Sequence, residues 1–192
     1  MLENLLRFDL RLFFHINGQW HNAALDVILP MLREPFFWAP LYLFLGLFVT
    51  INYGWKGLFW IFFFLISFGL ADQASLYIKE AVGRLRPCRD PLINQFVRVL
   101  VVYCPSSGSF TSSHAANHFA LGTFCFLTLK KIIPGYAWLF LVWAAIIGYA
   151  QIYVGVHYPL DITGGAILGI LIGLLTGRVF QRRIRLESEL IS

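Results

Sequence analysis

The sequence predicts an all-α integral membrane protein, a bundle of about five transmembrane helices with interfacial helices at its N-terminus. Of its 192 residues, 58% are hydrophobic and only 13% are charged, which is too few polar side chains to cover a soluble domain. Five uncharged runs supply the candidate spans, and most approach or reach the roughly 20 residues that cross the hydrocarbon core of a bilayer. They are residues 35–53, 57–71, 115–129, 132–156 and 162–177.

Residues 1–34 are expected to form helices that lie at the membrane interface. Charged and apolar residues interleave over 5–14, which interrupts any apolar signal-peptide core and suits a helix at the headgroup boundary. A second interfacial segment is expected over 22–32, leading into the first span. A sixth span here would place four charges in hydrocarbon, at about 2.5 to 3.5 kcal/mol each at mid-bilayer. Those charges belong to Arg7, Asp9, Arg11 and Asp26.

The chain is expected to be a single domain, with a transmembrane core over 35–180 and a cytoplasmic tail over 181–192. With five spans, seven of the 15 basic residues lie on the side of that tail and eight on the other, so the raw count does not orient the protein. Setting aside Lys79, Arg84 and Arg86 as a catalytic cluster leaves seven against five, which favours a cytoplasmic C-terminus. The basic residues behind the net charge of +5 are expected at the membrane edges, and no nucleic-acid partner is expected.

The polar connection 84–113 and the short turn 152–160 are expected on the same face of the membrane. Loops as long as the first usually carry function, and three clusters of polar residues meet there. The first cluster is Lys79, Arg84 and Arg86, at the end of the second span. Cations at a helix C-terminus also complement the helix dipole and extend to the interface, so this cluster alone is ambiguous.

The second cluster, residues 109–115, places hydroxyl groups before the third span. The third cluster, residues 155–161, places His157 and Asp161 on either side of Pro159. Serines there are ordinary N-caps, but their hydroxyl groups and the free N–H groups also bind anions. Pro159 can open the last helix with Asp161 in its first turn, so that His157 and Asp161 touch. This set of groups fits phosphoryl transfer. Cations and N–H donors can bind the phosphate, one histidine oriented by a carboxylate can attack it, and a second histidine can protonate the leaving oxygen.

These motifs resemble those of the type 2 phosphatidic acid phosphatases, or lipid phosphate phosphatases, which share a fold with the vanadium haloperoxidases. The family pattern is Lys, six residues, Arg-Pro; then Pro-Ser-Gly-His; then Ser-Arg, five residues, His, three residues and Asp. The resemblance covers roughly residues 23–180. The positions that match the pattern are Lys79 to Arg86-Pro87, Ser112, His114, His157 and Asp161. The departures are Thr111 for the proline, Ser113 for the glycine and Ala150-Gln151 for Ser-Arg.

The resemblance implies a role for each matched position. His157 would attack phosphorus to form a phosphohistidine, Asp161 would hold its other nitrogen, and His114 would protonate the leaving oxygen. The phosphate oxygens would be bound by side chains and N–H groups of Lys79, Arg86, Ser112, Ser113 and His114. Gln151 takes the place of a further, charged ligand. No magnesium or other cofactor is implied.

Two further features admit simple structural explanations. His114 and His118 stand one helical turn apart, a spacing that also binds zinc, but the HExxH glutamate and an obvious third ligand are absent, so we expect no metal site. Asp72 precedes Lys79 by one heptad, about 10 Å along the same helix face. It either tunes Lys79 or makes a polar helix contact with no catalytic part.

Cys88 and Cys104 share the polar loop, whereas Cys125, the third cysteine, lies in a span. We expect the first two to form a disulfide if the loop is extracytoplasmic, where oxidation is permitted, and a bridge of this size would add roughly 3 kcal/mol of stability.

The expected substrate is a membrane lipid phosphate or pyrophosphate, whose tail lies between helices. Undecaprenyl pyrophosphate is favoured because a short stand-alone enzyme suits lipid-carrier recycling, with phosphatidylglycerol phosphate, phosphatidic acid and lipid A phosphates as alternatives. The expected location is the bacterial inner membrane, with the active site facing the periplasm or, more generally, the extracytoplasmic side. A protein that binds or moves lipid without catalysis is left open by the departures at Thr111, Ser113 and Gln151, whereas the resembling haloperoxidases are larger and soluble. The oligomeric state is not predicted.

Overall fold

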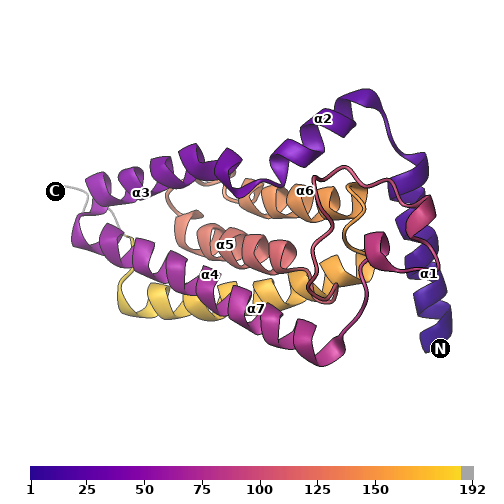
Figure 1. The fold of residues 1–192 in the computed structure, drawn as a ribbon. Helices are drawn as coiled ribbons and strands as arrows, with labels where there is room; N and C mark the ends of the chain where they lie inside the picture. The colour runs from indigo at the N-terminus through magenta and orange to yellow at the C-terminus, as the bar shows by residue number, and fades with distance from the viewer. Residues whose placement is uncertain (187–192) are drawn as a thin grey trace.

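Five helices run side by side and a sixth crosses their ends in the computed structural model, which describes residues 1–186 (Figure 1). The long helices are α3 (Ala39–Tyr53), α4 (Trp55–Val82), α5 (Ser113–Leu129), α6 (Leu139–Tyr153) and α7 (Pro159–Arg183). Helices α1 (Leu2–Phe14) and α2 (Ala23–Leu32) precede them. The all-α prediction is confirmed, because residues 1–186 contain no strand. Of the predicted tail, residues 187–192 lie outside the described part.

Within residues 1–186, three helices are long and apolar enough to cross a membrane, namely Pro35–Tyr53, Trp55–Val82 and Pro159–Arg183. Helices α5 and α6 lie alongside them but have only 17 and 15 residues. The uncharged run 132–156 is not helical throughout, because turns occupy its first residues and α6 begins at Leu139. The chain is an integral membrane protein, and the count of five spans stays a prediction.

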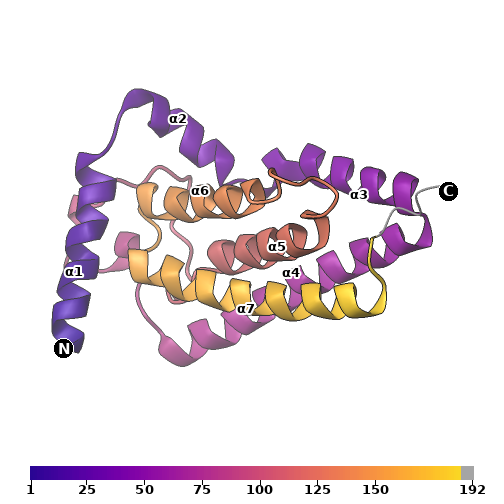
Figure 2. The same cartoon turned by 180° about the vertical axis from the view of Figure 1, so that it is seen from behind.

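Helix α5 lies at the centre of the bundle, packed between α4, α6 and α7 (Figure 2). Its closest approach is to α7, along the small residues Gly165, Gly169 and Gly173. A Cβ atom at Gly169 would stand only 2.2 Å from the carbonyl oxygen of Ala116 on α5. Glycine at this four-residue spacing therefore lets the two backbones touch, which brings the first turns of α5 and α7 together at one end of the bundle.

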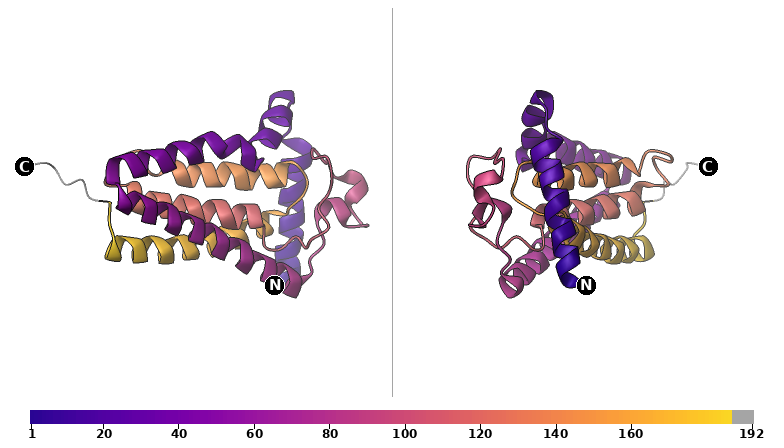
Figure 3. Two further views of the ribbon diagram at one scale, coloured as in Figure 1. Left: turned by 60° about the vertical axis from the view of Figure 1, so that its left-hand side comes forward. Right: turned by 90° about the vertical axis from the view of Figure 1, so that its right-hand side faces the viewer.

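Helix α1 lies across that same end of the bundle (Figure 3). Its buried face carries Asp9 and Phe13, one helical turn apart, while its other residues are mostly exposed. Asp9 accepts a hydrogen bond from the backbone N–H of Leu160 at 2.8 Å, in the first turn of α7. The predicted interfacial helix is therefore attached to the start of the last span rather than lying loosely on the membrane.

Candidate active site

His157 and Asp161 lie where the turn after α6 enters α7. Asp161 is fully buried, and its Oδ2 lies 3.4 Å from His157 Nδ1. The same oxygen accepts hydrogen bonds from the backbone N–H of Tyr158 at 2.8 Å and from Ser109 Oγ at 2.5 Å. Asp161 thus caps the N-terminus of α7 and, through the same carboxylate, orients the imidazole ring.

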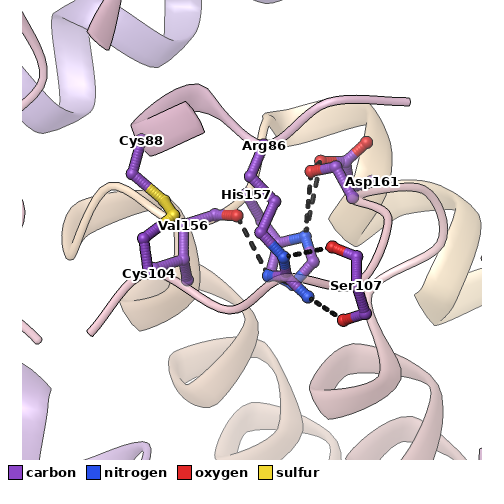
Figure 4. Close-up of a disulfide and its surroundings, with 8 residues drawn as sticks. Arg86, Cys88, Cys104, Ser107, Val156, His157 and Asp161 are labelled. Atoms are coloured by element: carbon purple, nitrogen blue, oxygen red, sulfur yellow. Dashed lines mark hydrogen bonds and ion pairs between the residues drawn. A yellow bond between two sulfur atoms is a disulfide. The ribbon is translucent and has the colours of Figure 1, made fainter. Parts of the chain in front are cut away.

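Arg86 holds the other nitrogen of the same ring. Its Nη1 lies 2.8 Å from His157 Nε2, and its remaining hydrogen bonds go to Val156 and Ser107 (Figure 4). A guanidinium group can only donate, so Nε2 is the acceptor and the ring proton sits on Nδ1, facing Asp161. Nε2 therefore presents its lone pair toward a cation, as a nucleophile for phosphorus requires.

Burial sets the charge state of this pair. It lowers the pKa of His157 to about 4, against the opposing effect of the Asp161 hydrogen bond, so the ring is neutral near pH 7. Burial also lowers the pKa of Arg86 to about 10, which leaves the guanidinium charged. A neutral imidazole beside a cation is a suitable arrangement for receiving a phosphate group.

Lys79 is the second cation of the site, and it contacts the hydroxyl group of Ser113. Lys79 lies in the last turn of α4, and its Nζ donates to Ser75 Oγ at 3.1 Å and to Ser113 Oγ. Ser112 is used differently, because its Oγ accepts from Ala115 N–H at 3.4 Å as the N-cap of α5. The hydroxyl group beside the lysine is thus that of Ser113, which stands where the family pattern has glycine.

His114, in the first turn of α5, lines two cavities that meet at this residue. The first, called here the apolar cavity, has a volume of about 410 Å³ and lies between α3, α4 and α5. The second, of about 590 Å³, is lined by Arg33 among other residues. Arg33 Nε is buried and has no hydrogen-bond partner among residues 1–186. No motif marks this arginine, so the sequence did not single it out.

Gln151 is fully buried in the last turns of α6. Its backbone carbonyl accepts from the N–H groups of Val156 and His157 at 3.2 and 3.3 Å, which shapes the turn that carries the nucleophile. Neither its amide nitrogen nor its amide oxygen has a partner in the described part of the chain. A contact between this amide and phosphate stays a prediction.

Arg84 joins α1 to the site. Its Nη1 lies 2.7 Å from Asp161 Oδ1 and its Nη2 lies 2.6 Å from Asp9 Oδ2. Sequence reasoning grouped Arg84 with the catalytic cations but missed Asp9 as its partner and Ser109 as a donor to Asp161. The available signal for Asp9 was its place one turn before Phe13, on the apolar face of the helix.

His114 and His118 would need a further ligand to bind zinc. Within residues 1–186 no group of three or more His, Cys, Asp or Glu side chains could hold a metal ion. His118 Nδ1 lies 2.8 Å from the backbone carbonyl of His114. Asp72 accepts a hydrogen bond from Asn117 Nδ2 at 3.0 Å, and the hydrogen bonds of Lys79 go to serines. An effect of Asp72 on Lys79 stays a prediction.

A disulfide joins Cys88 to Cys104, with a Cα–Cα distance of 6.1 Å (Figure 4). It links the segment that follows Arg86 to the segment that precedes Ser107. Because Arg86 donates to Ser107, the bridge closes the loop around the arginine that touches the nucleophile. Cys125 is a buried free thiol.

Comparison with known proteins assigns the chain to a family. Residues 57–185 match the PAP2 superfamily. The chain is 30% identical over 175 residues to lipid A 4'-phosphatase of Bacteroides thetaiotaomicron, covering 88% of this chain and 75% of that protein. It is 24% identical over 155 residues to undecaprenyl-diphosphatase BcrC of Bacillus subtilis, covering 81% and 75%. The crystal structure of LpxE from Aquifex aeolicus superposes with a TM-score of 0.67 at 26% identity, covering 89% of this chain and 95% of that one. This chain belongs to the PAP2 superfamily and is a membrane lipid phosphate phosphatase.

Proposed function

We propose that the protein hydrolyses a membrane lipid phosphate or pyrophosphate through a phosphohistidine at His157, without a metal ion. The observation that carries this proposal is the contact between Arg86 Nη1 and His157 Nε2. It fixes the tautomer in which the lone pair of Nε2 faces the cations, while Asp161 faces the proton on Nδ1.

In the first step Nε2 attacks phosphorus, and the bond from phosphorus to the lipid oxygen breaks. Arg86 leaves Nε2 and binds phosphate oxygens together with Lys79 and the Ser113 hydroxyl group, while His114 gives a proton to the leaving oxygen. Asp161 stabilises the positive charge that the ring acquires. In the second step His114 takes a proton from water, which attacks phosphorus and releases phosphate and free His157.

The apolar cavity supports a lipid as the substrate. It begins at Ser113 and His114 and continues along Tyr42, Phe64, Leu65 and Phe68. Leu65 and Phe68 are 59% and 44% exposed, so the protein does not close the cavity at these residues. An acyl or prenyl chain can enter it from the bilayer while the phosphate stays at the polar end. The noncatalytic alternative has no comparable support.

Two lipid classes are candidates for the natural substrate. The likeness to undecaprenyl-diphosphatase supports the undecaprenyl pyrophosphate predicted from the sequence. The likeness to lipid A 4'-phosphatase is greater in identity and covers more of the chain, and it supports a lipid A phosphate. We place the lipid A phosphate first. The proposed location is the bacterial inner membrane, with the site and the disulfide on the periplasmic side.

Phosphate release from a panel of lipid phosphates, measured in detergent with EDTA present, tests this proposal. We expect release from at least one lipid of the panel at the same rate with and without EDTA, because cationic side chains supply the charge that a metal ion would otherwise provide. Activity that disappears with EDTA and returns with one specific divalent ion would contradict the metal-free mechanism. No release from any lipid would contradict the function itself.

A further inference from the structure

The apolar cavity contains one polar patch, formed by Asp72 on α4 and by Asn117 and His118 on α5. Asn117 and His118 are only 8% and 6% exposed. Asn117 Oδ1 and His118 Nε2 are both buried, and neither has a hydrogen-bond partner among the residues that the structure describes. Nearly all buried polar atoms of proteins are paired, so two unpaired atoms on residues that line one cavity point to a ligand.

Both orphan atoms are hydrogen-bond acceptors. The carbonyl of His114 can only accept, so His118 Nδ1 carries the ring proton and Nε2 of the neutral ring is left with its lone pair. The amide nitrogen of Asn117 donates to Asp72 Oδ1, which leaves the amide oxygen unpaired. Trp143, whose ring lies 4.9 Å from that of His118, does not supply the missing donor, because its Nε1 is itself unpaired in the described part.

The patch also lies close to the chemistry. The rings of His114 and His118 are 6.4 Å apart, and His118 follows one helical turn after the proposed general acid. A donor that reaches the patch must therefore stand near the phosphate, within the first few atoms of the lipid. An alternative explanation is that the Asp72–Asn117 hydrogen bond simply joins α4 to α5. That explanation does not account for the unpaired oxygen of Asn117 or for the unpaired nitrogen of His118.

We propose that Asn117, His118 and Asp72 bind hydroxyl or amide N–H groups that the substrate lipid carries next to its phosphate. This inference rests on the proposed function and narrows its substrate class. Phosphates of N-acylated amino sugars and of N-acylated amino alcohols carry such donors close to the phosphate. Prenyl pyrophosphates and diacylglycerol phosphates carry no such donor there, so they would leave the acceptors unpaired. An enzyme whose site is built to accept hydrogen bonds from its substrate reacts poorly with analogues that lack the donor.

The experiment compares two lipids that differ in these donors. Ceramide 1-phosphate carries an amide N–H and a hydroxyl group near its phosphate, whereas phosphatidic acid of matched chain length carries only esters. We expect kcat/KM to favour ceramide 1-phosphate by about 10-fold or more in the parent protein. His118→Phe and Asn117→Leu should each lower that ratio by slowing ceramide 1-phosphate alone, and His118→Gln, which keeps an acceptor, should retain part of it.

Thr123→Val is the matched control. Thr123 lies on the same helix, is 4% exposed and has an unpaired Oγ1 within residues 1–186, but it packs toward Gly173 of α7 and does not line the apolar cavity. Its variant should keep the parent ratio. Equal kcat/KM for the two lipids in the parent, or a preference that survives both His118→Phe and Asn117→Leu, would overturn the inference and leave the phosphatase function intact. If no lipid phosphate is hydrolysed, the proposed function fails and the inference fails with it.

Discussion

At the residue scale, the contact between Arg86 and His157 is the informative one. The guanidinium group lies against the lone pair of Nε2, on the side that phosphorus would approach, and it holds the nucleophile in the required tautomer. Binding a phosphate then exchanges one charge-assisted hydrogen bond for others and places the anion beside cations that are already present.

His157 is expected to remain uncharged well below neutral pH. Burial places its pKa near 4, below the ordinary value of about 6.5, so the neutral form should persist as the pH falls from 8 to 5 and be lost only near pH 4. NMR of ring-labelled histidine in detergent, assigned with His157→Gln, would measure this. A midpoint near 6.5 would contradict the account, because the ring would then be as accessible to water as a surface histidine.

Gln151 stands where the family pattern has an arginine, so variants at this position test how much the missing cation matters for phosphate binding. We expect Gln151→Ala to cost about 1 to 3 kcal/mol of transition-state stabilisation, because a phosphate oxygen would lose a donor. Gln151→Arg should bind vanadate or inorganic phosphate more tightly, since a guanidinium adds charge and a second donor.

Steady-state kinetics and vanadate inhibition decide the matter, with Gln73→Ala on the exposed face of α4 as a control that should behave like the parent. If Gln151→Ala is as fast as the parent and Gln151→Arg binds vanadate no better, Gln151 does not face the phosphate.

The sequence alone could place Lys79, Arg86, His114, His157 and Asp161 on one face, because helical spacing and a short turn bring each near a helix end. It could not find Asp9 or Ser109. Asp9 pairs with Arg84, 75 positions away along the chain, and Ser109 donates to Asp161, 52 positions away. Only tertiary packing decides which buried polar groups meet.

At the element scale, the contact between α5 and α7 determines where the catalytic groups stand. Ser113 and His114 begin one helix and Asp161 begins the other, so their separation depends on how closely the helices approach. Uncharged runs predicted these helices well, but they could not predict that α6 begins at Leu139. A run of apolar residues does not distinguish a turn from a helix.

Gly169→Leu is expected to push α5 and α7 apart. Its Cβ would stand 2.2 Å from the Ala116 carbonyl oxygen, so we expect a loss of about 1 to 3 kcal/mol in stability, with lower activity in the protein that still folds. Gly69→Ala on α4 is the control, because within the described residues no atom lies within 4 Å of its added Cβ. Thermal unfolding in detergent would compare the two, and equal stabilities would contradict the close packing.

Cys88 and Cys104 are expected to be joined in protein isolated without reductant, because the structure pairs them in a loop that we place on the periplasmic side. Mass spectrometry of the alkylated, unreduced protein would show the linked peptides, with Cys125 as the internal free-thiol reference. Two alkylated thiols at 88 and 104 would contradict the bridge and count against the periplasmic location.

At the scale of the whole molecule, composition and motif order were enough to predict an all-helical membrane phosphatase, because both are properties of the chain rather than of its packing. The number of spans is different. Helices α5 and α6 are shorter than a bilayer core requires, and α5 is packed between α4, α6 and α7. Substrate selectivity is also a property of packing, since it depends on which side chains of α4 and α5 line one cavity.

The central claim is that phosphate passes through His157, and trapping the covalent intermediate tests it most directly. The parent protein would be mixed with a radiolabelled lipid phosphate in EDTA, quenched in alkali, where phosphohistidine survives, and digested for mass spectrometry. We predict label on His157 in the parent and none in His157→Gln, which should also release no phosphate. Label on another residue, or phosphate release by His157→Gln at the parent rate, would contradict the mechanism.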